Sequence, residues 1–307
     1  MTAIPTRDDV ERARRTIGTR LKRTPLLSSR TIGAGLKAEL FQRTGSFKSR
    51  GALNKLSSLG VDEKRRGVIA ISAGNHAQAT AFAAAAEGVD ALVVMWRGAS
   101  EQKIAATRGY GATVDLEAGG PAEAFDRLHE LIEQTGRTLV HPFDDPVVIA
   151  GAGTVGLEIE DDAPDADAVV VPVGGGGLIS GIQTALAGRM RVIAVEPELS
   201  TALHAGLEHG EPTHVEPRSI ADGLSAPFAG KLALEICKDL ERVLVTDDEI
   251  EDAFRMLYQR AKLAVEPAGA TATAAWLSGR IQAENPVLLV SGGNVASQTA
   301  AAILARP

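Results

Sequence analysis

Cysteine is nearly missing from this chain of 307 residues, which contains only Cys237. A single cysteine cannot form an intrachain disulfide, so the sequence favours a reducing compartment and predicts a cytoplasmic protein. The surrounding residues, 234–237, have the pattern of a helix. We therefore interpret Cys237 as a buried, inert thiol rather than a nucleophile.

Positive charge is also scarce. The chain has 32 Lys and Arg against 39 Asp and Glu, which gives a formal net charge of −7 and a pI of about 5.5. Nucleic acids and anionic membrane surfaces bind basic faces, so the composition predicts neither of them as a partner. A small anionic ligand is not excluded, because it needs only a few local donors.

Long hydrophobic runs are absent as well. No stretch approaches the roughly 20 apolar residues that span a bilayer, and residues 1–6 lack the apolar core of a signal peptide. Hydrophobic residues still make up 45% of the chain and charged residues 23%, an ordinary globular composition. The length suffices for one large domain or two smaller ones with a substantial core.

What is present is an alternation of short apolar strands with helices. We expect strands at 68–71, 91–95, 112–116, 138–140, 168–173, 191–195, 243–246 and 287–290. We expect helices at 77–87, 100–108, 121–134, 178–187, 248–262, 267–277 and 295–305. This alternation predicts an α/β fold with parallel sheets covered by helices on both faces, and ligands at the carboxyl ends of the strands.

The alternating block at 67–143 is compact, and we expect it to form a small domain. The flanking segments, 1–66 and 144–307, would then pair into a larger, discontinuous domain. Before the block, the patterns predict an amphipathic helix at 8–18, a weak strand at 36–41 and a helix at 48–59 with Ala52, Leu53 and Leu56 facing inward. We interpret the acidic stretch 158–167 as a solvated loop.

Lys48 is the first candidate catalytic residue. It follows Gly45, Ser46 and Phe47 and begins the helix predicted from residue 48. The positive end of a helix dipole disfavours an ammonium, and a free lysine amine is a nucleophile that can form a Schiff base. An exposed lysine at a helix start is the alternative, and this run alone does not separate the two.

Four consecutive glycines form the strongest local signal for a binding site. Gly174, Gly175, Gly176 and Gly177 follow an apolar strand, and Leu178 begins the next predicted helix. Such a turn directs several backbone N–H groups into one cavity at a helix N-terminus, which suits a phosphate. The dinucleotide and Walker patterns are both absent from this run. The alternative, a plain glycine turn, is the weaker interpretation.

Two further polar turns follow strands. One of them contains a hydroxyl, an amide and an imidazole beside the N–H groups of a helix start, in the run Ser72-Ala73-Gly74-Asn75-His76. Together these groups suit the binding of a carboxylate. Capping of that helix by Ser72 or Asn75 is the competing interpretation. Ser291 follows the last apolar strand and either binds a ligand or caps the final helix; taken alone, capping is favoured.

Taken together, an amine nucleophile, a phosphate cradle and a carboxylate seat fit pyridoxal 5′-phosphate (PLP) and an amino acid. At this point the chain resembles the fold type II PLP-dependent enzymes, in the branch of threonine/serine dehydratases and serine racemases. The motifs occur in family order over nearly the whole chain: TGSFKSRGA at 44–52, SAGNHAQ at 72–78, HPFDDP at 141–146, GGGG at 174–177, VEPAGA at 265–270 and SGGN at 291–294. The resemblance implies a two-lobed fold like that of the tryptophan synthase β subunit.

The resemblance also implies roles around the cofactor. Lys48 would hold PLP as a Schiff base and move the Cα proton, and Phe47 would pack against the ring. Asn75 would bond the ring oxygen, and Ser291 would face the pyridine nitrogen. The glycines 174–177 and Leu178 would donate N–H groups to the phosphate. The substrate carboxylate would be bound by Ser72, Ala73, Asn75 and His76.

The implied reaction is the elimination of water and ammonia from L-threonine or L-serine, which leaves a 2-oxo acid. Racemases carry a serine where this chain has Ala73, so the resemblance favours dehydration. The alternatives are a dehydratase for 3-hydroxyaspartate, a serine racemase and a catalytically silent PLP- or amino-acid-binding protein.

Some relatives bind a cation through a Glu and an Asp six residues later. Glu196 fits the first position, but Ala202 stands at the second, so we expect no metal. We also expect a homo-oligomer, a dimer or a tetramer.

Overall fold

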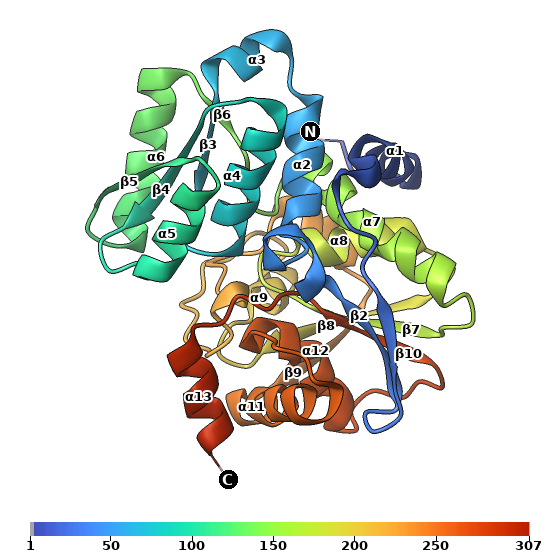
Figure 1. The fold of residues 1–307 in the computed structure, drawn as a ribbon. Helices are drawn as coiled ribbons and strands as arrows, with labels where there is room; N and C mark the ends of the chain where they lie inside the picture. The colour runs from blue at the N-terminus through green and yellow to red at the C-terminus, as the bar shows by residue number, and fades with distance from the viewer. Residues whose placement is uncertain (1–2, 307) are drawn as a thin grey trace.

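The computed structural model describes residues 3–306, which form two sheets surrounded by helices (Figure 1). The six-stranded sheet has the order β1-β2-β10-β7-β8-β9, and the four-stranded sheet has the order β5-β4-β3-β6. The larger sheet consists of β1 (Leu26–Ser29), β2 (Ala34–Ala38), β7 (Ala168–Pro172), β8 (Arg191–Pro197), β9 (Glu241–Val245) and β10 (Pro286–Val290). The smaller sheet consists of β3 (Val68–Ile71), β4 (Ala91–Trp96), β5 (Thr113–Ala118) and β6 (Thr138–Leu139).

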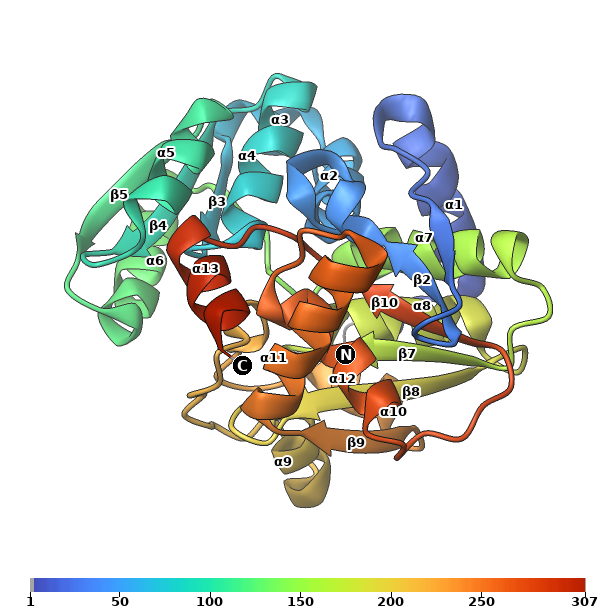
Figure 2. The same cartoon turned by 60° about the horizontal axis from the view of Figure 1, so that its bottom comes forward.

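The helices lie on both faces of the sheets, as the alternation predicts (Figures 1 and 2). Those in the first half are α1 (Arg7–Ile17), α2 (Lys48–Ser58), α3 (Val61–Arg66), α4 (Asn75–Glu87), α5 (Glu101–Gly109), α6 (Pro121–Thr135) and α7 (Pro146–Asp162). Those in the second half are α8 (Gly177–Leu186), α9 (Ala202–His209), α10 (Lys231–Cys237), α11 (Asp247–Met256), α12 (Pro267–Leu277) and α13 (Ser297–Ala305). None of the helices within 3–306 is long and apolar enough to cross a membrane.

The strand residues divide between the two faces of each sheet. In β3, Val68 packs in the core that contains α4, whereas Ile69 packs in the core that contains α6. In β7, Val169 packs in the α7 and α8 core, whereas Val170 packs in the α12 core. Because successive strand side chains point to opposite faces, a strand covered on both sides must be apolar throughout. This explains the continuous apolar runs in the sequence.

The prediction of a solvated loop at 158–167 is wrong for its first half, although residues 163–167 do lie outside any helix. Residues 158–162 are the last turn of α7, a helix that the sequence analysis missed. Glu158 is buried and accepts hydrogen bonds from Arg50 at 2.7 and 2.9 Å and from Lys37 at 2.7 Å. Arg50 also contacts Glu39 twice, at 2.8 Å. The partner cations lie more than a hundred residues away, so a local pattern could not reveal them.

Several other boundaries differ from the predicted ones. The first two strands pair antiparallel, so the larger sheet is mixed rather than parallel throughout. The strand expected at 36–41 ends at Ala38 and continues as a 3-10 turn. The helix expected at 248–262 is α11 followed by a π-helical turn at Leu257–Ala261. The final helix begins at Ser297, too late for Ser291 to cap it.

Two other predictions match the structure: the helix at 48–59 and the buried, inert thiol of Cys237. Burial raises the pKa of this thiol to about 12.

The carboxyl ends of strands from both sheets face a common region. The tetraglycine turn follows β7, Ser291 follows β10, and Asn75 follows β3 of the smaller sheet. Lys48 starts α2, and Ser46, two residues before it, forms an isolated bridge with Gly292. The division of the chain into domains at residues 67 and 143 stays a proposal.

Candidate active site

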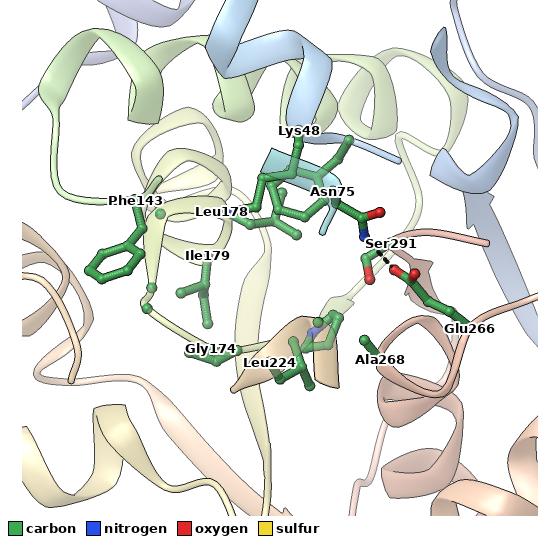
Figure 3. Close-up of a pocket in the computed structure, with 17 residues that line it drawn as sticks. Lys48, Asn75, Phe143, Gly174, Leu178, Ile179, Leu224, Glu266, Ala268 and Ser291 are labelled. Atoms are coloured by element: carbon green, nitrogen blue, oxygen red, sulfur yellow. Dashed lines mark hydrogen bonds between the residues drawn. The ribbon is translucent and has the colours of Figure 1, made fainter. Parts of the chain in front are cut away.

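Lys48 lies at the first position of α2 and borders a cavity between the two sheets (Figure 3). The backbone N–H of Phe47 donates to the carbonyl of Ser291 at 3.1 Å, which ties the start of α2 to the end of β10. The Nζ of Lys48 donates to the carbonyl oxygen of Pro142 at 2.8 Å and lies 5.2 Å from the centre of the Phe47 ring. The lysine therefore has a defined position within the protein.

The surroundings of Lys48 favour its neutral amine. Burial lowers the pKa of Lys48 to about 8, because a desolvated ammonium loses its water. No carboxylate within residues 3–306 forms an ion pair with it that would restore the charge. At neutral pH about a tenth of such amines are unprotonated, against roughly one in three thousand for an ordinary lysine. The site thus supplies a nucleophile and a proton acceptor.

The turn at 141–145 fixes the carbonyl that Lys48 contacts. His141 accepts hydrogen bonds through Nδ1 from the backbone N–H groups of Phe143 at 3.3 Å and Asp144 at 2.8 Å. Burial lowers the pKa of His141, which keeps this nitrogen free to accept. The carboxylate of Asp144 in turn accepts from the backbone N–H of Leu232 at 3.0 Å, at the start of α10. Pro142 is therefore held between two fixed neighbours.

Residues 174–179 line the same cavity, and their backbone N–H groups lack partners among residues 3–306. None of the six donates a hydrogen bond to any of residues 3–306, although the N–H of the flanking Val173 and Ser180 do. Unpaired N–H groups at the start of α8, with the helix dipole behind them, attract an anion. This is the clearest electrostatic feature of the cavity.

Side chains could not replace the glycines of this turn. A Cβ at Gly175 would lie 2.2 Å from the Phe143 ring, and one at Gly176 would lie 2.3 Å from the Cβ of Ala233. Gly176 also has a φ of +92°, which only glycine adopts readily. The turn is therefore built for close approach of other groups to its backbone.

The turn after β3 provides a second set of free N–H groups. Helix α4 is preceded by Gly74 as the N-cap, so neither Ser72 nor Asn75 caps it. The N–H groups of Ala73, Asn75 and His76 donate to no partner within the described chain. Ser72 accepts from the N–H of Gly74 at 3.1 Å. The backbone here can bind a carboxylate.

The imidazole of His76 takes no part in the cavity. It is buried, and its Nε2 contacts the carbonyl of Val140 at 2.8 Å. Burial, followed by the nearby Lys48, lowers the pKa of His76 to about 3, so the ring is neutral. Of the residues 72, 73, 75 and 76, only Asn75 lines the cavity with Lys48. Any contact of Ser72, Ala73 or His76 with a ligand would therefore be at the rim or through the backbone.

The cavity has about 470 Å³ of space, including the part open to solvent. Sequence reasoning placed Phe47, Lys48, Asn75, the glycines, Leu178 and Ser291 around one ligand, and all of them line this space (Figure 3). It missed several further lining residues: Phe143, Ile179, Gly223, Leu224, Glu266 and Ala268. Phe143 and Glu266 lie within motifs recognised in the sequence, so their positions could have suggested a role there.

Glu196 lies away from this cavity. It is buried at the end of β8, and its carboxylate accepts from the N–H groups of Leu203 at 2.7 Å and His204 at 3.0 Å. Burial raises the pKa of Glu196 to about 7, while these donors oppose the shift. The carboxylate thus caps the start of α9. Within residues 3–306 no group of three His, Cys, Asp or Glu side chains is placed to hold a metal ion.

Comparison with known proteins agrees with this geometry. The family described as pyridoxal-phosphate dependent enzyme matches residues 17–293. The chain belongs to this family. It is 45% identical to the catabolic L-threonine dehydratase of Staphylococcus aureus, over 94% of this chain and 88% of that protein. Among solved structures, a T.th. threonine deaminase matches with a TM-score of 0.89 and 40% identity, covering 95% and 99% of the two chains. A maize serine racemase matches with a TM-score of 0.90 and 33% identity, covering 97% and 96%.

The cavity fits the cofactor that defines the family. Six unpaired N–H groups at the start of α8 suit the phosphate, and the glycines leave room for it against the backbone. Lys48 suits the aldehyde, because its amine is deprotonated far more readily than that of an exposed lysine. The cavity lies between these two features. We conclude that the residues present suit PLP.

Proposed function

We propose that this protein is a PLP-dependent ammonia-lyase that converts L-threonine and L-serine into a 2-oxo acid and ammonia. The observation that carries the proposal is the pairing of a desolvated Lys48 with a tetraglycine turn whose N–H groups are free. The relatives named above support the choice of substrate, since two of them are described as acting on threonine. PLP, when bound, supplies the conjugated system that withdraws electrons from the substrate Cα.

Lys48 has two tasks in this proposal. Its Nζ would hold the cofactor at rest and, when free, would accept the proton from the substrate Cα. The lowered pKa serves both tasks, because each requires the neutral amine. The carbonyl of Pro142 accepts a hydrogen bond from Nζ at 2.8 Å and would hold the free amine near the substrate.

The other residues bind and orient. The N–H groups of residues 174–178 would hold the phosphate, and Phe47 would pack against the ring. Asn75 would donate to the ring oxygen and Ser291 would face the ring nitrogen. A hydroxyl holds a proton on that nitrogen less strongly than a carboxylate would, which favours prompt loss of the β-hydroxyl.

The substrate carboxylate binds at the start of α4 in this proposal. The free N–H groups of Ala73, Asn75 and His76 are the principal donors, with the hydroxyl of Ser72 beside them. The His76 imidazole contributes no charge, since it is neutral and turned toward Val140. Recognition of the carboxylate is thus mainly a property of the backbone.

Racemisation of serine is the second candidate, because two serine racemases share this fold at TM-scores of 0.90 and 0.89. Racemisation needs a group that returns a proton to the face of Cα opposite the lysine. By the resemblance described above, Ala73 stands where racemases carry serine, and its methyl group has no proton to give. We therefore favour elimination.

The test is a substrate panel with the purified, PLP-loaded protein. We expect 2-oxobutanoate from L-threonine and pyruvate from L-serine, with little D-serine. Efficient D-serine formation would favour the racemase, and turnover of 3-hydroxyaspartate alone would favour that dehydratase. A yellow protein that turns over none of these amino acids would be a silent binder and would contradict the proposal.

We also propose a cytoplasmic homo-oligomer, a dimer or a tetramer, with the small domain at 67–143 set against a discontinuous domain of 1–66 and 144–307. The two sheets support this division, since the smaller one lies wholly within 68–139. Light scattering of the purified protein would measure the oligomeric state.

A further inference from the structure

The Asn75 side chain lies between two polar partners that come from distant parts of the chain. Figure 3 shows one of them, Glu266. Its Nδ2 donates to Oε1 of Glu266 at 2.7 Å, and its Oδ1 accepts from Nδ2 of Asn294 at 2.8 Å. Glu266 is the N-cap residue of α12, and Asn294 follows β10. The two contacts connect the start of α4 with the start of α12 and with the loop after β10.

The order of donors and acceptors fixes which way each amide faces. Asn294 also donates through Nδ2 to the carbonyl oxygen of Thr44 at 2.7 Å. A carbonyl can only accept, so Asn294 must present its nitrogen to Thr44 and to Asn75. Asn75 must then present its oxygen to Asn294 and its nitrogen to Glu266. A flipped Asn75 would bring two nitrogens together on one side and two oxygens together on the other.

Within residues 3–306, this arrangement leaves one N–H of Asn75 without an acceptor. The amide nitrogen has two hydrogens, and Glu266 accepts one of them. Asn75 lines the cavity together with Lys48 and Ser291. We propose that Glu266 and Asn294 are positioning residues, which hold the Asn75 amide so that an N–H donor rather than the carbonyl oxygen meets the cofactor ring.

The environment of Glu266 suits such a fixed acceptor. Only 4% of the residue is exposed, and its backbone N–H donates to the carbonyl of Gly292 at 3.2 Å. A Cβ at Gly292 would lie 2.2 Å from Oε1 of Glu266, so the carboxylate packs closely against the backbone of this glycine. Burial and then Asp222 raise the pKa of Glu266 to about 7, whereas the hydrogen bond from Asn75 favours its charged form. The pair is therefore mutually stabilising.

The inference rests on the proposed contact between Asn75 and the ring oxygen of PLP. A double-mutant cycle tests the positioning of Asn75 separately from that contact. Asn294→Asp removes the donor to Asn75 at constant size, and Glu266→Leu removes the acceptor. Each is made in the native chain and in an Asn75→Ala background, and the dissociation constant of PLP is measured by absorbance titration. Asn285→Asp makes the same amide-to-carboxylate change at an exposed residue and serves as the control.

We expect each single variant to weaken PLP binding by about tenfold, the equivalent of one lost hydrogen bond. In the Asn75→Ala background the same changes should alter the affinity by less than about twofold, because they act only through Asn75. Equal losses in both backgrounds, or no loss in the native one, would overturn the inference. If Asn75→Ala itself left the affinity unchanged, the proposed role of Asn75 would fail and the inference with it.

Thermal unfolding of each variant without cofactor separates positioning from folding. A purely structural role would lower the melting temperature and the PLP affinity together in every background. The positioning role predicts that Asn294→Asp and Glu266→Leu lose affinity only where residue 75 is asparagine, whatever their melting temperatures.

Discussion

The amine of Lys48 donates a hydrogen bond of 2.8 Å to the carbonyl of Pro142. A backbone carbonyl carries no full charge, so this contact positions the amine without forcing it to stay protonated. Burial destabilises the ammonium form of Lys48, and the same effect makes the neutral, reactive amine easier to form. The stability and the chemistry of the protein are linked through this one residue, and both can be measured.

The first prediction concerns stability. The pKa of Lys48 falls from 10.5 to about 8 on folding. A lowered lysine pKa costs stability below the folded pKa, and the cost disappears as the pH rises to the unfolded value. Lys48→Met should therefore stabilise the cofactor-free protein near neutral pH by up to about 3 kcal/mol, at 1.36 kcal/mol per pK unit. Urea unfolding should show this gain shrinking as the pH approaches about 10.5. A gain that does not depend on pH would contradict the assignment.

The second prediction concerns the rate of cofactor attachment. Only the neutral amine attacks the aldehyde, so the rate at which PLP attaches to the cofactor-free protein should rise with pH and level off above about 8. Nα-acetyl-lysine is the control, because its amine keeps an ordinary pKa and its rate should rise until about 10.5. Parallel pH profiles for the protein and the control would show that Lys48 is not desolvated.

The third prediction concerns the tetraglycine turn. A Cβ at Gly175 would lie 2.2 Å from the Phe143 ring, so Gly175→Ala must displace either the ring or the turn. We expect PLP to bind at least about tenfold more weakly, because the N–H groups of the turn would no longer converge on one phosphate. Gly109→Ala is the matched control, since nothing lies within 4 Å of a Cβ there. Equal affinity of the two variants in an absorbance titration would count against the phosphate cradle.

The fourth prediction concerns the buried ion cluster behind α2. Arg50→Met removes both hydrogen bonds from Arg50 to Glu39, which keeps only the one from Thr24, and it weakens the pairing of Glu158. Removing one partner of a buried ion pair costs about 3–5 kcal/mol, whereas an exposed pair contributes less than about 1 kcal/mol. Arg65→Met, which removes an exposed pair with Asp62, is the control. Urea unfolding should separate the two variants clearly, and similar losses would mean that the cluster contributes little.

The sequence revealed those parts of the site that rest on local patterns. An apolar strand followed by four glycines, and a lysine at a helix start, are features of a few consecutive residues. Glu266 and Asn75 are 191 residues apart, and Arg50 and Glu158 are 108 apart. Contacts of this kind depend on the complete fold, so sequence reasoning placed Glu158 in a loop and gave Glu266 no role. Helix α7 was missed because all but its ends are buried, which removes the amphipathic pattern.

The most direct test of the account is to locate the bond between the protein and the cofactor. The protein is loaded with PLP, reduced with borohydride and digested, and the modified peptide is identified by mass spectrometry. We predict a single pyridoxyl-lysine at Lys48, and no labelled peptide from Lys48→Ala treated in the same way. Modification of any other lysine, with Lys48 unmodified, would contradict the assignment of this cavity as the active site.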